Sequence, residues 1–217
     1  MAPVAPNPGG RRLSSRLKLS LALAGPLLLM LLLACTPGIS FTEDLGRHLL
    51  LGRIILETRQ VPDTNLLTYT CPDFPFVNHH WLSEVVLYLL HRAGGLNGLI
   101  LWKMCMLTVA LGLALLAGRP QRGLALYALA GLLAAVLLGF RAHIRPELFT
   151  YFCLALYLWS FERIRGGARW PYALLLPVAW LWANAHIYFF FGLGMLGLFV
   201  AEGLVRTVRP VDGVDKI

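Results

Sequence analysis

Six apolar runs, each close to the length that crosses a lipid bilayer, constrain this chain more than any other feature of its sequence. A helix needs roughly 20 apolar residues to span the hydrocarbon core. Most of the runs are apolar all round, whereas a surface helix of a soluble protein keeps a polar face. The runs lie at 13–35, 96–117, 123–140, 147–163, 171–184 and 187–205. The sequence therefore predicts an all-α fold, a polytopic transmembrane helix bundle of about six spans.

The composition agrees with a membrane protein and argues against a soluble one. Hydrophobic residues make up 58% of the 217 positions and charged residues only 14%, whereas a soluble domain has about 25% charged residues. A net charge of +8 would suggest nucleic-acid binding in a soluble protein. Here the arginines lie in short segments between apolar runs, so no nucleic-acid partner is expected. The four cysteines form no CxxC pair, which argues against a zinc site or a disulfide framework.

The basic residues predict how the chain is oriented, because cytoplasmic loops of membrane proteins carry an excess of lysine and arginine. Six crossings place the main basic clusters in the cytoplasm, together with a disordered N-terminus at 1–12 and a tail at 206–217. The segment 36–95 and the breaks at 141–145 and 184–186 then face outward together. Polar residues from distant parts of the sequence are therefore expected on one side of the membrane.

Two parts of this topology have alternatives. Residues 13–35 are either a retained helix or a cleaved signal peptide, and LLAC at 32–35 resembles a lipoprotein cleavage box in which Cys35 is acylated. The retained helix is preferred because the crossings in the rest of the chain are then consistent with one orientation in the membrane. The run at 171–184 is short for a crossing, so residues 171–205 form either two spans or a re-entrant pair.

The segment 36–95 is the one long polar stretch and is predicted to hold two short helices. From about 42 to 58, Leu45 and Ile55 can share one face, with charged residues elsewhere around the helix. After a proline-rich connection, a second helix is expected from about 79 to 92. Neither is long enough and apolar enough to span, so we expect both to lie along the membrane surface.

Several blocks of the sequence resemble bacterial membrane proteins of the GT-C glycosyltransferase superfamily, the kind that uses polyprenyl-phosphate sugars. The matching stretches are DLGRHLLLGRIIL, VPDTNLLTYT, HHWLSEVVLYLL and GGLNGLI between Asp44 and Leu101, then RPELFTYFCLALYL at 145–158 and LWANAHIYFFFGL at 181–193. The resemblance implies that residues 13–205 form one transmembrane GT-C-like domain in the bacterial inner (plasma) membrane. It also implies transfer of a sugar from a lipid-linked, polyprenyl-phosphate donor to an outward-facing lipid, glycan or protein acceptor.

In such enzymes a carboxylate in the first external loop acts as the catalytic base or orients the acceptor, and Asp44 stands at that position. Asp44 is equally suited to cap the surface helix that follows it. The donor presents its phosphate at the membrane interface, where cations must neutralise the leaving group. Arg145, Arg53 and His48 are the expected cations. The other residues expected to bind substrate at this interface are His79, Glu84, Asn184 and His186.

Departures from the family leave other interpretations open. Complete relatives are much longer, and Gly46 and His80 replace an aromatic residue and a glutamate that are common there. The main alternative is a truncated, non-catalytic GT-C-like subunit that packs through small-residue stripes against other membrane protein subunits and lipids. A transporter is less favoured, because Lys103 is the one charged residue well inside a span and can snorkel to the surface. A divalent metal ion at His48, His79 and His80 stays open, although no ligand spacing requires it.

Overall fold

The computed structural model describes residues 14–36, 44–71, 74–118 and 123–208. These residues form seven helices and, apart from a single bridge between Thr64 and Pro75, no strand pairing. The helices are α1 (Ser15–Ala34), α2 (Leu45–Thr58), α3 (Trp81–Ala117), α4 (Leu124–Gly139), α5 (Glu147–Arg165), α6 (Tyr172–Ala185) and α7 (Phe189–Val208). The predicted all-α class is confirmed for this part of the chain. The expected disordered segment 1–12 and the tail from residue 209 lie outside the described residues.

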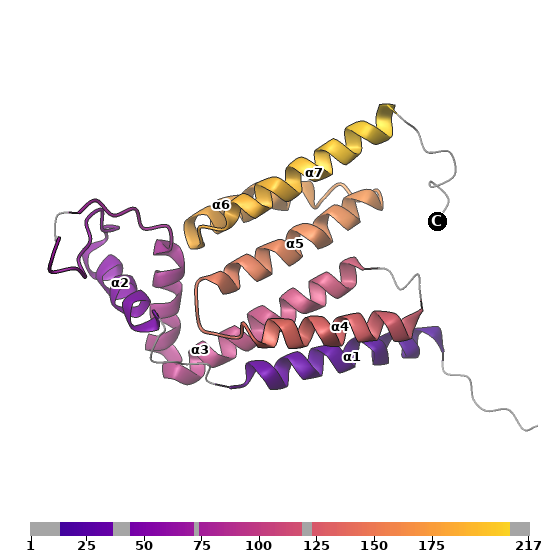
Figure 1. The fold of residues 1–217 in the computed structure, drawn as a ribbon, viewed down its shortest axis with the longest axis horizontal. Helices are drawn as coiled ribbons and strands as arrows, with labels where there is room; N and C mark the ends of the chain where they lie inside the picture. Colours follow the sequence, from indigo (N-terminus) through magenta and orange to yellow (C-terminus); the bar gives the residue numbers. More distant parts are fainter. Residues whose placement is uncertain (1–13, 37–43, 72–73, 119–122, 209–217) are drawn as a thin grey trace, which may run out of the picture.

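Gly95 divides α3 into two helical parts. Its φ of 58° and ψ of −148° form a conformation that glycine adopts readily and residues with a Cβ rarely do. The first part covers 81–94 and the second 96–117, and Figure 1 shows α3 changing direction along its length. The two parts correspond to the short helix expected at 79–92 and the span expected at 96–117.

The other helices run along a common direction and reverse at each connection. Figure 1 shows α1, the second part of α3, and α4 to α7 arranged in this way, with α2 and the first part of α3 across one end. We call that end piece, residues 44–71 and 74–94, the polar lobe. The α4–α5 connection (140–146) and the α6–α7 connection (186–188) lie at the same end, whereas α1 begins and α7 ends at the other. The three segments expected to face one side therefore meet.

Small residues let α1 and α4 pack closely. A Cβ built on Gly131 of α4 would lie 2.8 Å from Cγ of Pro26 in α1, and one built on Gly139 would lie 2.7 Å from Cδ1 of Leu33. The buried side chains around these contacts, several of them from α3, are Met30, Ala34, Leu107, Leu111, Leu115, Ala135, Ala142 and Leu148. Close van der Waals packing of this kind drives helix association in membranes.

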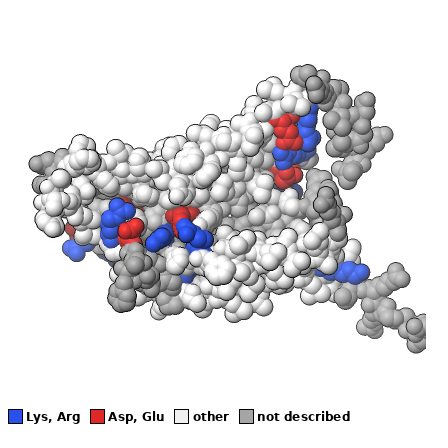
Figure 2. Space-filling view, viewed as in Figure 1, with Lys and Arg blue, Asp and Glu red and all other residues white. Residues whose placement is uncertain are grey.

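Three of the described helices, α1, α3 and α7, are long and apolar enough to cross a membrane. The helices α4 and α6 are apolar too, but they have 16 and 14 residues. Figure 2 shows the Lys, Arg, Asp and Glu side chains gathered toward the two ends of the visible face, with an uncharged belt between them. These are features of a membrane protein. The number of crossings, about six according to the sequence, stays a prediction.

Lys103 does not snorkel to the surface, so this expectation from the sequence was wrong. Lys103 is 0% exposed, and its Nζ donates to the carbonyl oxygens of Thr36 at 2.5 Å and Ala142 at 3.0 Å. A buried ammonium is tolerated where other polar groups replace its water. Because Thr36 follows α1 and Ala142 lies in the α4–α5 connection, Lys103 ties both segments to α3.

Candidate functional site

Hydrogen-bonding side chains from distant parts of the chain meet where the polar lobe rests on the bundle. All are buried except His80, which is partly buried. We call them the imidazole site: His48 of α2, Asn78, His80 and Glu84 around the start of α3, Thr150 of α5, and Trp182 and His186 around the end of α6. Buried polar groups destabilise a fold unless they are hydrogen-bonded, so their partners show how the site is held.

Glu84 is the centre of the hydrogen bonds within the lobe. Its Oε1 lies 3.1 Å from Nδ1 of His48, and its Oε2 accepts a hydrogen bond of 2.6 Å from Nδ2 of Asn78. Oδ1 of Asn78 accepts in turn from the backbone N–H of His80 at 3.0 Å. Glu84 is 0% and His48 3% exposed. Both carboxylate oxygens therefore have protein partners in place of water.

A glycine lets the two helices of the lobe approach closely enough for this pairing. Gly52 follows His48 by one turn of α2, so the two residues share a helix face. At Gly52 the neighbour is the backbone of Glu84 itself, with the Cβ of Tyr88 beside it. A side chain at position 52 would overlap the backbone of Glu84, so the close approach of α2 and α3 requires glycine there.

Three imidazole rings form a row that leads from the lobe to the bundle. The ring centroids of His48 and His80 are 5.7 Å apart, and those of His80 and His186 are 5.2 Å apart. Nδ1 of His186 is hydrogen-bonded to Oγ1 of Thr150 at 2.8 Å, and Nε1 of Trp182 donates to the same oxygen at 2.9 Å. The row is thus held by a carboxylate at one end and by a hydroxyl at the other.

Burial keeps two of these rings neutral. It lowers the pKa of His80 to about 4, and the nearby His48 and Arg47 add to the decrease while Glu84 opposes it. Burial also lowers the pKa of His186 to about 4, with a further decrease from His80 and His48. At neutral pH both rings can form hydrogen bonds but carry no positive charge.

Positive charge near the site comes from arginines. Nε of Arg47 in α2 and Nε of Arg145 before α5 are buried without a hydrogen-bond partner among the described residues. Arg141, by contrast, pairs with Glu147 at 2.9 Å, and its Nε lies 3.5 Å from the hydroxyl of Tyr151. A buried donor without a partner destabilises the fold. An anionic ligand would supply the partner that these two N–H groups of Arg47 and Arg145 lack.

The structure brings together several residues predicted from the sequence. His48, Glu84 and His186 all belong to the imidazole site. Asn184 is linked to the start of α3, because its Oδ1 accepts a hydrogen bond of 2.9 Å from Nε1 of Trp81. Arg145 lies in the α4–α5 connection at the same end of the bundle.

Other predicted residues lie elsewhere on the lobe. Asp44 is exposed before α2, and its side chain makes no capping hydrogen bond, although its carbonyl accepts from the N–H of His48 at 3.0 Å. Arg53 pairs with Glu57 at 2.8 Å on an exposed face of α2. His79 is exposed. Asp44 is thus one turn from His48, whereas Arg53 and His79 are not drawn into the buried site.

The sequence does not single out Asn78, Thr150 or Trp182 as site residues, and it marks His80 only as a candidate metal ligand. Asn78 and His80 carry a usable signal, because they precede Glu84 at a helix start, where polar side chains bond back to the first turn. Thr150 and Trp182 carry none, since both lie within apolar runs that look like parts of the bundle core.

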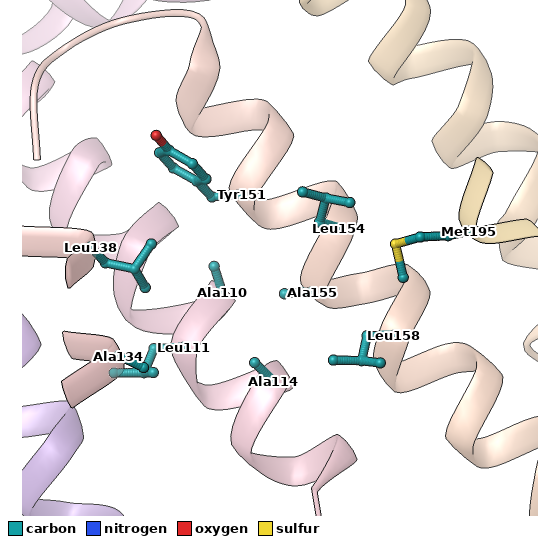
Figure 3. Close-up of a pocket in the computed structure, with 10 residues that line it drawn as sticks. All are labelled: Ala110, Leu111, Ala114, Ala134, Leu138, Tyr151, Leu154, Ala155, Leu158 and Met195. Carbon is teal, nitrogen blue, oxygen red and sulfur yellow. The ribbon is translucent and has the colours of Figure 1, made fainter. Parts of the chain in front are cut away.

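An apolar cavity of about 300 Å³ lies in the bundle beside Tyr151. Figure 3 shows Tyr151 and Leu158 of α5 facing side chains of α3 and α4 across it, with Met195 of α7 at one edge. The hydroxyl of Tyr151 is the group near Arg141, and the preceding residue, Thr150, belongs to the imidazole site. The cavity and the imidazole site thus each include a residue from the start of α5.

Within the described residues, no group of three or more His, Cys, Asp or Glu side chains is arranged to hold a metal ion. The divalent ion considered at His48, His79 and His80 gains no support from this arrangement. No protein-family model, curated protein or solved structure matches the chain. The function of the protein is therefore inferred from its own residues and contacts.

Proposed function

We propose that this protein is a membrane glycosyltransferase-like protein that transfers a sugar from a polyprenyl-phosphate donor to an outward-facing acceptor at the bacterial inner membrane. In this proposal about six helices cross the bilayer and both termini are cytoplasmic. The supporting observation is a buried carboxylate–imidazole pair, with arginines that have partnerless nitrogens, at one end of an apolar bundle. Ionisable groups at the edge of hydrocarbon are costly and are typically retained for function.

The protein offers groups that suit both the donor and the acceptor of such a reaction. Arg145 and Arg47 suit the phosphate, because a guanidinium forks onto phosphate oxygens. The apolar cavity beside Tyr151 suits an isoprenoid chain. Asp44, exposed at the start of α2, suits an acceptor hydroxyl that must be held in line with the anomeric carbon. Asn184, at the end of α6, suits a sugar hydroxyl.

Transfer from a polyprenyl-phosphate hexose, measured on purified protein in lipid nanodiscs, tests the proposal. In Asp44→Asn we expect about a hundredfold loss of transfer, because misplacing a reacting group by an ångström has effects of that size. Asp63→Asn is the matched control, since Asp63 is another exposed aspartate of the lobe. Unchanged transfer by folded Asp44→Asn removes the role of Asp44. Failure of the unmodified protein to transfer any polyprenyl-phosphate sugar overturns the proposal itself.

A second function, a non-catalytic subunit of a larger membrane complex, is favoured by one feature of α7. A Cβ built on Gly194 or Gly197 would meet no atom of the described residues within 4 Å, so these small residues have no close neighbour in that part of the chain. Small residues on an open helix face allow a partner helix to approach closely. Native mass spectrometry after gentle extraction separates the two functions. A stable hetero-oligomer without transfer activity supports the subunit, and a lone protein excludes it.

A further inference from the structure

We propose that His48 is the proton acceptor of the transfer reaction, that Glu84 is the positioning residue for His48, and that Asn78 positions Glu84. This inference rests on the proposed function and concerns how its acceptor is activated. An acceptor hydroxyl must lose its proton as it attacks the sugar. A base within hydrogen-bond reach contributes about 10²–10⁴-fold to the rate of such a step.

The contacts of Glu84 determine which nitrogen of His48 carries the hydrogen. An ionised carboxylate only accepts hydrogen bonds, and Oε1 of Glu84 lies 3.1 Å from Nδ1 of His48. Nδ1 therefore carries the hydrogen of the neutral ring, which leaves the lone pair on Nε2. A carboxylate behind an imidazole also stabilises the imidazolium that forms when the ring takes a proton. Nε2 of His48 is therefore the nitrogen that takes the proton in this proposal.

Asn78 determines how the carboxylate is presented. Its Nδ2 donates to Oε2 of Glu84 at 2.6 Å, while its Oδ1 accepts from the backbone N–H of His80 at 3.0 Å. The bond to the backbone fixes which side of the amide faces the carboxylate. With Oε2 occupied by Asn78, Oε1 is the oxygen that faces His48. Partners of this kind, one step removed from the reacting group, orient it and tune its basicity.

Other groups that face His48 are less suited to accept the proton. The ring centroid of His80 lies 5.7 Å from that of His48. Asn78 is hydrogen-bonded to the backbone N–H of His80 and not to the His80 ring. His186 lies further along the row and is hydrogen-bonded to Thr150. Arg47 is a permanent cation. Among the described groups at this end of the bundle, His48 is the imidazole paired with a buried carboxylate.

The proposed step balances in atoms and charge. The acceptor oxygen forms a bond to the anomeric carbon, and the bond from that carbon to the donor phosphate breaks. The polyprenyl phosphate leaves with the electron pair of the broken bond. The hydroxyl proton moves to Nε2 of His48, and Glu84 stabilises the imidazolium through Nδ1–H. The ring returns the proton to water after the product leaves, with no oxidation or reduction.

Transfer rates measured against pH, in nanodiscs with a polyprenyl-phosphate hexose, test this role. His48→Gln should lower kcat by about 10²–10⁴-fold and remove the fall in activity on acidification, because no ring remains to be protonated. Glu84→Gln should lower kcat and alter the pH dependence of transfer, since it replaces the carboxylate that contacts Nδ1 of His48. Asn78→Ala should lower kcat with little effect on the KM for the donor.

Matched controls come from the same helices. His91→Gln in α3 and Glu57→Gln in α2 replace residues outside the imidazole site and should keep both the rate and the pH profile of the unmodified protein. A purely structural role for the His48–Glu84 pair predicts something different. Its variants would unfold at lower temperature, while the remaining activity would keep the original pH profile, and that result contradicts the proposal.

Nuclear magnetic resonance of histidine-labelled protein supplies a measurement that does not depend on catalysis or on folded variants. At neutral pH the ring of His48 should carry its hydrogen on Nδ1, and a hydrogen on Nε2 instead overturns the assignment. Transfer by His48→Gln at the unmodified rate overturns the role of His48 and leaves the proposed function standing. Absence of transfer by the unmodified protein overturns both.

Discussion

The backbone carbonyl oxygen of Glu84 lies only 2.1 Å from the point where a Cβ on Gly52 would stand. The helices α2 and α3 thus meet backbone to backbone one turn away from His48. This contact sets the separation across which the imidazole of His48 and the carboxylate of Glu84 pair at 3.1 Å. The geometry of the candidate site is therefore decided by a residue that has no side chain.

Gly52→Ala should push α2 away from α3 and separate His48 from Glu84. Over-packing of a close contact destabilises a protein by about 1–3 kcal/mol, so the unfolding temperature and the transfer rate should both fall. The matched control is Gly46→Ala on the same helix, where a Cβ meets nothing within 4 Å. Alanine there should stabilise the helix by about 0.5–1 kcal/mol. Equal thermal unfolding of the two variants would contradict the importance of the contact.

Lys103→Met should loosen two segments that are distant in sequence. The substitution keeps a long side chain but removes the donor to the carbonyls of Thr36 and Ala142. A buried acceptor that loses its partner destabilises the fold by about 1–3 kcal/mol. Hydrogen exchange followed by mass spectrometry should become faster at the end of α1 and in the α4–α5 connection. Lys18→Met, at an exposed site on α1, is the control, and unchanged exchange in Lys103→Met would show that Lys103 does not hold these segments.

Acidification should destabilise the folded protein. The pKa of His80 and of His186 is about 4 in the folded state, against an ordinary value of 6.5, so in that interval the unfolded chain binds protons that the folded chain does not. The stability that these two histidines contribute is fully present above pH 6.5, their ordinary pKa, and declines as the pH falls toward about 4, their pKa in the folded state. Thermal unfolding measured at several pH values in this range gives the slope of stability against pH. His186→Gln should make the dependence shallower, and an unchanged slope would exclude His186 as a source.

Arg145→Gln should weaken binding of the donor. Loss of a charge-assisted hydrogen bond removes about 1.5–3 kcal/mol, which corresponds to roughly a ten- to hundredfold rise in the KM for the lipid-linked sugar. Arg92→Gln, at an exposed arginine of α3 in the polar lobe, controls for the change in net charge. Transfer rates titrated against donor concentration give the answer. A KM unaffected by Arg145→Gln would exclude this guanidinium as a phosphate ligand.

The positions of the helices follow from the sequence within a few residues. The run at 123–140 contains α4, and the run expected to begin at 187 is α7, which starts at Phe189. Apolar runs predict these helices well, because residue type alone decides which segments are compatible with hydrocarbon. Gly95, where the two parts of α3 meet, is likewise marked by its residue type.

The imidazole site is harder to predict, because it depends on contacts between remote segments. His80 and His186 belong to opposite halves of the chain and meet where the polar lobe lies across the bundle. Thr150 looks like any residue of an apolar helix until its hydrogen bonds to His186 and Trp182 are known. Arg53 shows the reverse case: the pattern suggests a cation near the site, but its partner is Glu57, four residues on.

Lys103 donates to one carbonyl that precedes it in the sequence and to one that follows it. Thr36 precedes it by 67 residues, and Ala142 follows it by 39. While the chain is still on the ribosome, a newly made α3 has the first of these oxygens within reach but not the second. An ammonium that lacks part of its coordination is costly in hydrocarbon. In the order of synthesis, the contact between Lys103 and Ala142 can therefore form only after α4 has been translated.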